Sequence, residues 1–260
     1  MNKLLRKVRR AILRDEPTYY DMFLNPGERF LARIYLHEIT QVLRTHGRPA
    51  PLEILDAGCQ AGRLAVPLAS AGHRVTGVDT SAVALNRARR HAEEAGTKLK
   101  LIRADLGQWL PKMPAGSFDA VLCTEVLYLR QNHRELLGEL LRLLRPGGLC
   151  FISHRPTGYY LAEAVGRKDW QAVETLLTQK EGTLFGSYYN WQERAELEEI
   201  YAGLGIADLR VTPVGFLSWL VTQPDKLTEP EQEKLLQADL ALAEQFSHPG
   251  RYLLVSGRKK

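Results

Sequence analysis

The chain has 260 residues, which is enough for one large α/β domain, or for a domain with a substantial insertion, around a full hydrophobic core. Its composition, 45% hydrophobic and 25% charged, is that of an ordinary globular protein, and no apolar run approaches the roughly 20 residues of a membrane-spanning helix. Cys59, Cys123 and Cys150 lie singly, without the paired spacing of zinc ligands or of a disulfide framework. These features predict a reduced, cytoplasmic protein without a transmembrane segment or a metal site.

The net charge of +5 is concentrated at the two ends of the chain. Residues 1–14 carry six basic side chains and no acidic one, and residues 258–260 add three more. Without these nine, 26 basic residues stand against 30 acidic ones. The body of the chain therefore lacks the excess positive charge that is typical of nucleic-acid binding.

Residues 1–14 place four apolar side chains at helical spacing between the charges, which predicts a basic amphipathic helix. We expect this helix to dock on its own domain. An arm that contacts a membrane surface or a nucleic acid, or a cleaved targeting peptide, is the alternative. Residues 1–50 together are expected to form an N-terminal helical segment, or lid, that precedes the main domain of residues 51–260.

From residue 52 onward, short β-rich runs alternate with helical patterns, which predicts βαβ units and a parallel sheet covered on both faces. A helix of residues 132–145 is expected to end at Arg145-Pro146-Gly147-Gly148, where proline and glycine turn the chain. The other expected strands are 53–57, 74–79, 99–104, 118–123, 148–154, 206–213 and 252–256, and the other expected helices are 62–71, 81–95, 192–203 and 229–246.

Residues 155–191 depart from this alternation and hold seven aromatic residues in 37 positions, against 8% for the whole chain. The segment directly follows the strand of residues 148–154, so it is predicted to be an insertion beside the ligand-binding edge of the sheet. Tyrosines combine a large apolar face with a polar tip, which suits the wall of a substrate pocket. The alternative is that these aromatic residues only pack the insertion onto the domain.

The most informative stretch is the turn between the first strand and the first helix, which contains Gly58 and Gly62. Glycines let a backbone approach a ligand closely, and the helix amides that follow are unsatisfied donors. The dinucleotide fingerprint requires glycine at positions 58, 60 and 63, but residues 60 and 63 are Gln60 and Arg63. NAD and FAD are therefore disfavoured as cofactors.

Two carboxylates follow the next two strands. Asp79, in Asp79-Thr80-Ser81, ends the second strand, where a carboxylate can accept both hydroxyl protons of a ribose. Its alternative role is to cap the following helix, a role that Ser81 could fill itself. Asp105, followed by Leu106, ends the third strand, where it could accept from an exocyclic amine of adenine.

In this order the motifs resemble those of the class I S-adenosylmethionine-dependent methyltransferases, over about residues 52–154. The resemblance rests on Asp56-x-Gly58-x-x-x-Gly62, Asp79, the Ala-Asp pair ending in Asp105, Phe118-Asp119-x-Val121 and Arg145-Pro146-Gly147-Gly148. The family commonly has glycine where this chain has Gln60, which implies a local change in the turn. The resemblance implies a Rossmann-like, doubly wound α/β fold whose seven-stranded, mostly parallel sheet has the order 3-2-1-4-5-7-6, only the last strand being antiparallel, with a mostly helical insertion after strand 5.

The resemblance also implies S-adenosylmethionine as cofactor, S-adenosylhomocysteine as product and no metal. The turn around Gln60 would face the methionyl part, Asp79 with Thr80 the ribose, and Asp105 with Leu106 the adenine. Tyr20 would belong to an N-terminal segment that closes over the cofactor, or would anchor a helix to the core. The full set of expected cofactor-binding residues is Tyr20, Asp56, Gly58, Gln60, Gly62, Asp79, Thr80, Asp105, Leu106, Cys123 and Thr124.

Candidates for catalysis lie beyond the carboxyl edge of the predicted sheet, where open α/β sheets bind ligands. His154, after the fifth strand, is the first candidate for a base or an acceptor-orienting group, and Glu125 and Tyr128 follow the fourth strand. The alternative for His154 is a structural histidine whose nitrogens are satisfied by backbone groups. The expected acceptor-binding residues are Tyr128, His154, Tyr159, Tyr160, Tyr188 and Tyr189.

The expected acceptor class rests on two motifs that the chain lacks and on the aromatic-rich insertion, which suggests an enclosed pocket for a small, partly apolar molecule. The stretch after the fourth strand, Cys123-Thr124-Glu125-Val126, has neither an Asn-Pro-Pro-Tyr-like run nor the Pro-Cys nucleophile of nucleic-acid methyltransferases. We therefore expect methyl transfer to an O, N or C nucleophile of a small molecule. The alternatives are an RNA or protein acceptor bound through the basic N-terminal helix, and a non-catalytic S-adenosylmethionine-binding module. No feature of the sequence specifies an oligomeric state.

Overall fold

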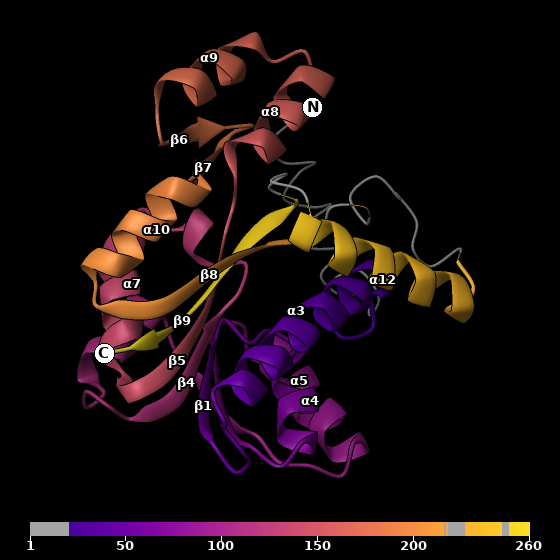
Figure 1. Ribbon diagram of the computed structural model, residues 1–260, viewed down its shortest axis with the longest axis vertical. Helices are drawn as coiled ribbons and strands as arrows, with labels where there is room; N and C mark the ends of the chain where they lie inside the picture. The colour runs from indigo at the N-terminus through magenta and orange to yellow at the C-terminus, as the bar shows by residue number, and fades with distance from the viewer. Residues whose placement is uncertain (1–20, 216, 218–226, 246–249) are drawn as a thin grey trace.

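The computed structural model describes residues 21–215, 217, 227–245 and 250–260 (Figure 1). The helix expected over residues 1–14 and the candidate Tyr20 lie outside the described residues. Within the described part, no helix is both long and apolar enough to cross a membrane.

The core of the protein is a seven-stranded sheet with the order β3-β2-β1-β4-β5-β9-β8. Numbered among these seven strands alone, this is the order 3-2-1-4-5-7-6, so the predicted fold is confirmed. The strand β9 runs antiparallel to both of its neighbours, and the remaining pairs are parallel. The strands are β1 (Glu53–Ala57), β2 (Arg74–Asp79), β3 (Lys100–Arg103), β4 (Phe118–Cys123), β5 (Leu144–His154), β8 (Ile206–Val214) and β9 (Tyr252–Lys259).

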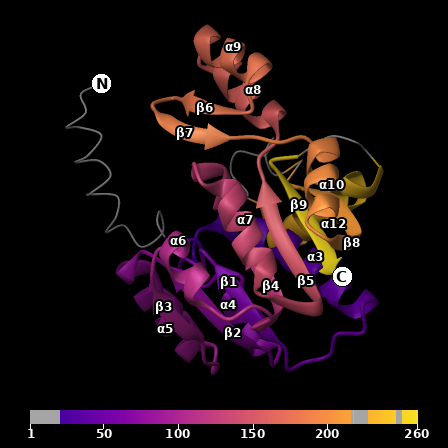
Figure 2. The same ribbon diagram turned by 90° about the vertical axis from the view of Figure 1, so that its left-hand side faces the viewer.

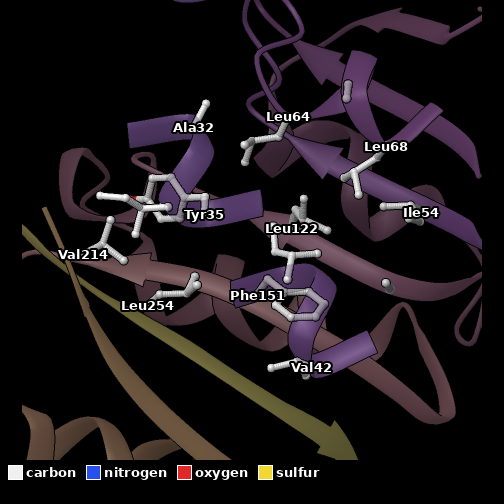
Figure 3. Close-up of a cluster of buried hydrophobic side chains, with 14 of the residues drawn as sticks. Ala32, Tyr35, Val42, Ile54, Leu64, Leu68, Leu122, Phe151, Val214 and Leu254 are labelled. Atoms are coloured by element: carbon white, nitrogen blue, oxygen red, sulfur yellow. The ribbon is translucent and has the colours of Figure 1, made fainter. Parts of the chain in front are cut away.

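Helices cover both faces of this sheet because its central strands are apolar on both sides. Successive residues of β4 go to opposite faces: Leu122 packs under α3 and α4, whereas Val121 packs under α7 and α10. Figure 3 shows the first of these two clusters. The helices are α3 (Pro26–Thr45), α4 (Ala65–Ser70), α5 (Ala82–Glu94), α6 (Leu106–Trp109), α7 (His133–Arg142), α10 (Arg194–Gly203) and α12 (Glu229–Gln245).

The helix α3 is an integral layer of the domain. Asn25 caps its first turn by accepting from Glu28 N, and Pro26 occupies its first position. The buried face of α3 packs on the sheet through residues such as Ile34 and Ile39, and α12 packs against α3. Of the described residues 21–50, the short segment before α3 is the part that lies nearest the carboxyl edge.

One predicted boundary was wrong. The helix expected over residues 132–145 ends at Arg142, and Arg145 to Gly148 lie inside the strand β5 rather than in a turn before it. Glycine is required there because a Cβ on Gly148 would lie 2.9 Å from the carbonyl oxygen of Arg145 and 3.0 Å from that of Asp119. The register between β4 and β5 shifts at this point, so the Pro-Gly-Gly run forms an irregular strand edge.

The insertion leaves the end of β5 and stands apart from the sheet (Figure 2). It consists of α8 (Thr157–Gly166), α9 (Trp170–Thr178) and an antiparallel hairpin of β6 (Glu181–Leu184) and β7 (Ser187–Asn190). The hairpin was not predicted. Trp191, fully buried, joins α8, α9 and the hairpin in a small hydrophobic cluster of their own.

Candidate functional site

A pocket opens at the carboxyl ends of β1, β2, β3 and β4, where a ligand is expected in an open α/β sheet. It encloses about 790 Å³ of empty space, a volume that includes open solvent at its mouth. Its walls include Asp56, Gly58, Gln60, Asp79, Thr80, Asp105, Leu106 and Thr124, which are eight of the eleven residues expected to bind the cofactor.

The turn after β1 depends on backbone conformations that favour glycine. Gly58 has φ +89°, and a Cβ there would lie 2.3 Å from Val126 Cγ2. Gln60 has φ +47°, a left-handed conformation that is uncommon for a residue with a side chain. The glycine that the family commonly has at this position would adopt it without strain, so Gln60 carries a local conformational cost.

The side chain of Gln60 offsets this cost by serving as a hydrogen-bond acceptor. Its Oε1 accepts from Ala61 N at 2.7 Å and from Met22 N at 3.3 Å. Met22 also lines the pocket. Gln60 therefore ties the segment before α3 to the turn at the floor of the site.

The carboxylate of Asp79 lies at the rim of the pocket beside this turn. Its Oδ2 accepts from Gln60 N at 3.0 Å and its Oδ1 from Ser81 N at 2.8 Å. Ser81 caps α5 by accepting from Ala84 N, so the helix has a side-chain cap other than Asp79. Each carboxylate oxygen keeps acceptor capacity for a ligand hydroxyl.

Asp105 is held by Arg130, a residue that no motif of the sequence singles out. Arg130 Nη2 donates to both of its oxygens, at 2.9 and 3.2 Å, and both residues line the pocket. Asp105 also caps the short helix α6 by accepting from Gly107 N at 2.9 Å. Arg130 lies 25 positions along the chain from Asp105, and no spacing rule connects them.

The buried carboxyl of Asp56 forms the inner wall of the pocket. Its pKa is raised to about 7, mainly by burial and in smaller part by the neighbouring charge of Asp79, whereas Arg63 opposes the shift. Near neutral pH this group therefore exchanges between the neutral and the charged form.

Two expected cofactor contacts, Gly62 and Cys123, are not among the residues that line the pocket. Gly62 lies where the turn meets α5, and a Cβ there would come within 3.3 Å of Ala88 Cβ. Cys123 is fully buried in the core beneath α7. The close packing at Gly62 favours a structural role for this glycine.

Of the three catalytic candidates, Glu125 is the one that lines the pocket. It has φ +62°, and its N–H donates to Ser153 Oγ at 2.7 Å. Its side chain pairs with Arg63, at 2.7 Å, and Arg63 also pairs with Glu28 of α3. Burial, the largest single effect, would raise the pKa of Glu125. The charges of Arg63 and Arg155 and the hydrogen bonds from Arg63 and Tyr252 together outweigh it, so the pKa is lowered and the group is a carboxylate.

His154 lies under the insertion with both ring nitrogens engaged. Its Nδ1 lies 3.1 Å from Gln192 Oε1 and its Nε2 lies 2.8 Å from the Tyr201 hydroxyl. Burial lowers its pKa to about 4. Because the amide oxygen of Gln192 can only accept a hydrogen bond, Nδ1 donates to it, and Nε2 accepts from the Tyr201 hydroxyl. Neither ring nitrogen is therefore available to a methyl-accepting substrate. The structure favours the structural role of His154, with side chains rather than backbone groups as partners.

Tyr128 and Tyr159 are both stacked against the buried guanidinium of Arg155, which was not among the expected site residues. The Arg155 Cζ atom lies 4.8 Å from the ring centre of Tyr128 and 3.7 Å from that of Tyr159. The ring of Tyr252 lies 4.0 Å away on the same cation. Each contact is a cation–π geometry.

The other tyrosines of the insertion have two different surroundings. Tyr160 is 3% exposed and packs at 5.1 Å from the ring of Tyr189 and at 6.0 Å from that of Trp191. The hydroxyl of Tyr188 donates to Glu181 at 2.7 Å, across the hairpin. None of the six residues expected to bind the acceptor lines the described pocket.

The segment before α3 is anchored beside the pocket. The buried Asp21 places its Oδ2 2.9 Å from His91 Nε2 of α5, and Phe23 stacks on the His91 ring at 4.2 Å. This anchor holds Met22 against the pocket. Over the described ranges, no group of three or more His, Cys, Asp and Glu residues is arranged to hold a metal ion.

Comparisons with known proteins agree with this geometry. Residues 54–148 match the family described as a methyltransferase domain. The chain also resembles, in fold, the crystal structure of magnesium protoporphyrin IX methyltransferase from Synechocystis with bound S-adenosylhomocysteine. The TM-score is 0.56 at 19% identity, and the match covers 91% of this chain and 87% of that one.

Among curated sequences, the chain is 36% identical to the ubiquinone biosynthesis O-methyltransferase of Dechloromonas aromatica, over 44% of this chain and 49% of that protein. It thus spans about half the length of this relative. It is 31% identical to the protein of the same name from Chromobacterium violaceum, over 67% of this chain and 75% of that protein. The sequence similarity extends over three quarters of this relative and agrees with the order of the strands and the position of the pocket. This chain therefore belongs to the family of class I S-adenosylmethionine-dependent methyltransferases.

Proposed function

We propose that the protein binds S-adenosylmethionine in the described pocket and transfers its methyl group to a nucleophilic O, N or C atom of a small molecule. The observation that carries this proposal is the convergence of Asp79, Asp105 and the Gly58 turn on one pocket at the carboxyl edge of the sheet. When bound, the cofactor supplies a methyl group that its sulfonium already activates for transfer, so the protein does not need to activate the methyl donor.

The residues of this chain fit such a cofactor. Asp79 has acceptor capacity for two ribose hydroxyls, and Asp105, held by Arg130, has it for an adenine amine. Gly58 gives the backbone room, because a side chain at that position would fill the turn. Asp56 and Glu125 add carboxyl groups at the opposite end, where the cationic part of the cofactor would lie.

The protein's contribution to the rate is alignment. Holding an acceptor in line with the reacting bond is worth on the order of 7–11 kcal/mol in favourable cases. The acceptor would enter beyond β4 and β5, between Glu125 and the insertion of residues 155–191, which we propose covers this side. Residues before α3 would close the opposite side, as Met22 indicates.

The carboxylate of Glu125 would position the acceptor rather than remove its proton. It is already engaged by Arg63 and by the hydroxyl of Tyr252, and its lowered pKa makes it a weak base. His154 has no nitrogen to offer. We therefore propose that the acceptor reacts as a nucleophile that needs no strong protein base.

Release of S-adenosylhomocysteine tests this function whatever the identity of the acceptor. The protein would be incubated with S-adenosylmethionine and either fractionated small-molecule extract or total RNA. We expect release that depends on a small-molecule fraction. Release with RNA alone, or no release with any acceptor pool, would contradict the proposed function.

A further inference from the structure

A cluster of two arginines and three tyrosines lies beside the proposed active site. This arginine–tyrosine cluster consists of Arg155, Arg251, Tyr128, Tyr159 and Tyr252. The inference drawn from this cluster rests on the methyl transfer proposed above, and it concerns the chemical class of the methyl acceptor.

The cluster lies at the carboxyl edge of the sheet. Arg155 directly follows β5, and Tyr128 follows β4 by a few residues. Because β9 is antiparallel, its first residues lie at this same edge, where His154 pairs with Leu253. The Tyr252 hydroxyl donates to Glu125, which lines the pocket. The cluster therefore adjoins the pocket on the side where an acceptor would enter.

Arg155 is a buried cation, with 5% of its surface exposed. Its Nη2 donates to the Tyr252 hydroxyl at 2.7 Å, and its Nη1 lies 3.4 Å from the carbonyl oxygen of Arg251. Its further contacts are the Tyr128 hydroxyl, to which Nη2 donates at 3.5 Å, and the faces of the three tyrosine rings. Burial of a guanidinium against neutral groups is unfavourable unless a counter-charge compensates it.

The nearest carboxylates do not supply this counter-charge by direct contact. Glu28 and Glu125 both form their ion pairs with Arg63. Among the described residues, no carboxylate lies within ion-pair distance of Arg155 or Arg251. The guanidinium groups of Arg63, Arg155 and Arg251 thus share two carboxylates, those of Glu28 and Glu125. Burial also raises the pKa of Glu28, which makes its charged form less favourable.

Several hydrogen-bond donors at this place also lack an acceptor. The Nε atoms of Arg155 and Arg251 and the hydroxyl of Tyr160 are buried, and none of them has a partner within the described part of the chain. Buried polar groups are normally satisfied, so three unsatisfied donors around an excess of positive charge point to an anionic partner.

We propose that the arginine–tyrosine cluster binds an oxyanion group of the acceptor, so that the enzyme methylates a small acidic molecule. Carboxylate and phosphate groups share this chemistry, since a guanidinium donates to two oxygens of either one. The anion would engage Arg155 and Arg251, while the nucleophilic atom of the same molecule reaches toward the pocket past Glu125.

Binding of matched acidic and neutral probes tests this proposal. Benzoate, phenyl phosphate and benzamide would be titrated calorimetrically into the protein saturated with S-adenosylhomocysteine, which prevents turnover. We expect at least one acid to bind about tenfold or more tightly than benzamide, because each charge-assisted contact discriminates by about this factor. A preference for phenyl phosphate or for benzoate assigns the type of oxyanion.

Variants of the two arginines test whether the acidic group binds at the arginine–tyrosine cluster. Arg155→Gln and Arg251→Gln should each reduce the affinity for the acid about tenfold or more, while the affinities for benzamide and S-adenosylhomocysteine stay unchanged. If Arg155→Gln impairs folding because Arg155 is more deeply buried, Arg251→Gln still tests the proposal. The matched control is Arg167→Gln, which removes a guanidinium from the exposed end of α8 and should change none of these affinities.

Failure of the two proposals is distinguishable. If S-adenosylhomocysteine does not bind, the proposed function is wrong. If it binds but neither acid binds more tightly than benzamide, or if the preference survives in both Arg155→Gln and Arg251→Gln, the acidic acceptor is wrong while the proposed function stands.

Discussion

Among the residues of the pocket, Asp79 should contribute most to the affinity for the cofactor, through its carboxylate. Asp79→Ala removes two charge-assisted hydrogen bonds to the proposed ribose, each worth roughly 1.5–3 kcal/mol and partly replaced by water. We expect the affinity for S-adenosylhomocysteine to fall by about 2–4 kcal/mol in calorimetric titration.

The neighbouring Ser81 provides the control for this measurement. Ser81→Ala removes the cap of α5, so it should lower the free energy of unfolding by about 1 kcal/mol and leave the cofactor affinity unchanged. Wild-type affinity in Asp79→Ala would remove Asp79 from the site.

The raised pKa of Asp56 predicts a pH dependence of stability. The unfolded chain loses this proton near its ordinary pKa of 3.8, whereas burial keeps it on the folded protein up to about pH 7. The unfolded state is therefore favoured progressively from about pH 4 to about pH 7, and the stability present below that window is lost as pH rises through it. At about 1.4 kcal/mol per pKa unit, the loss amounts to a few kcal/mol.

Asp56→Asn should remove this part of the pH dependence, because asparagine does not titrate. The measurement is the difference in free energy of unfolding between wild type and variant from pH 4 to pH 8, without cofactor. Glu174→Gln, on the exposed face of α9, is the control and should not change the slope. Parallel pH profiles for wild type and Asp56→Asn would show that Asp56 is ionised throughout.

Among single residues, the sequence predicted which members of the motifs meet at the pocket. Gly58, Asp79 and Asp105 each end a strand or open a turn, so chain order alone brings them to one edge. Arg130 and Arg155 escaped prediction because their roles depend on partners distant in the chain, and arginines are most often surface residues. For His154 the structure favours the alternative stated from the sequence, a structural histidine, because both of its ring nitrogens are engaged by side chains.

Among the elements, the insertion is expected to behave as a packed unit rather than as a loose flap. Tyr160 lies in its core, so Tyr160→Ala should lower the free energy of unfolding by roughly 3 kcal/mol. Tyr188 is only partly buried, and Tyr188→Ala should cost about 1 kcal/mol through its lost bond to Glu181. Chemical denaturation of both variants measures the contrast.

Tyr160→Phe separates packing from function, since it removes only the hydroxyl that lacks a partner within the described residues. Retained stability with reduced turnover would assign this hydroxyl to the acceptor site. Equal loss of stability in Tyr160→Ala and Tyr188→Ala would contradict the packing described for the insertion.

Most elements could be predicted because the central strands are short apolar runs and the helices have clear periodicity. Two features could not. The Pro-Gly-Gly run reads as a helix stop and a turn, but pairing with β4 draws it into β5. The hairpin of β6 and β7 is short and polar on one side, and its pairing depends on the cluster around Trp191, which no local pattern reveals.

For the molecule as a whole, the order of the strands decides where chemistry takes place. The reversal between β1 and β4 opens the cofactor pocket, and the antiparallel β9 brings Arg251 and Tyr252 to the same edge as the ends of β4 and β5. The pocket and the arginine–tyrosine cluster thus adjoin, joined by the hydrogen bond between Tyr252 and Glu125. We propose that the segment before α3 covers the cofactor side and that the insertion covers the acceptor side.

We expect this pocket to bind S-adenosylmethionine rather than a dinucleotide, because the turn has Gln60 and Arg63 where the dinucleotide fingerprint has glycine. Calorimetric titration of the wild-type protein with S-adenosylmethionine, and in parallel with NADH, tests this expectation. We predict saturable binding of S-adenosylmethionine at one site per chain and weaker or undetectable binding of NADH. Tighter binding of NADH, or no binding of S-adenosylmethionine, would contradict it.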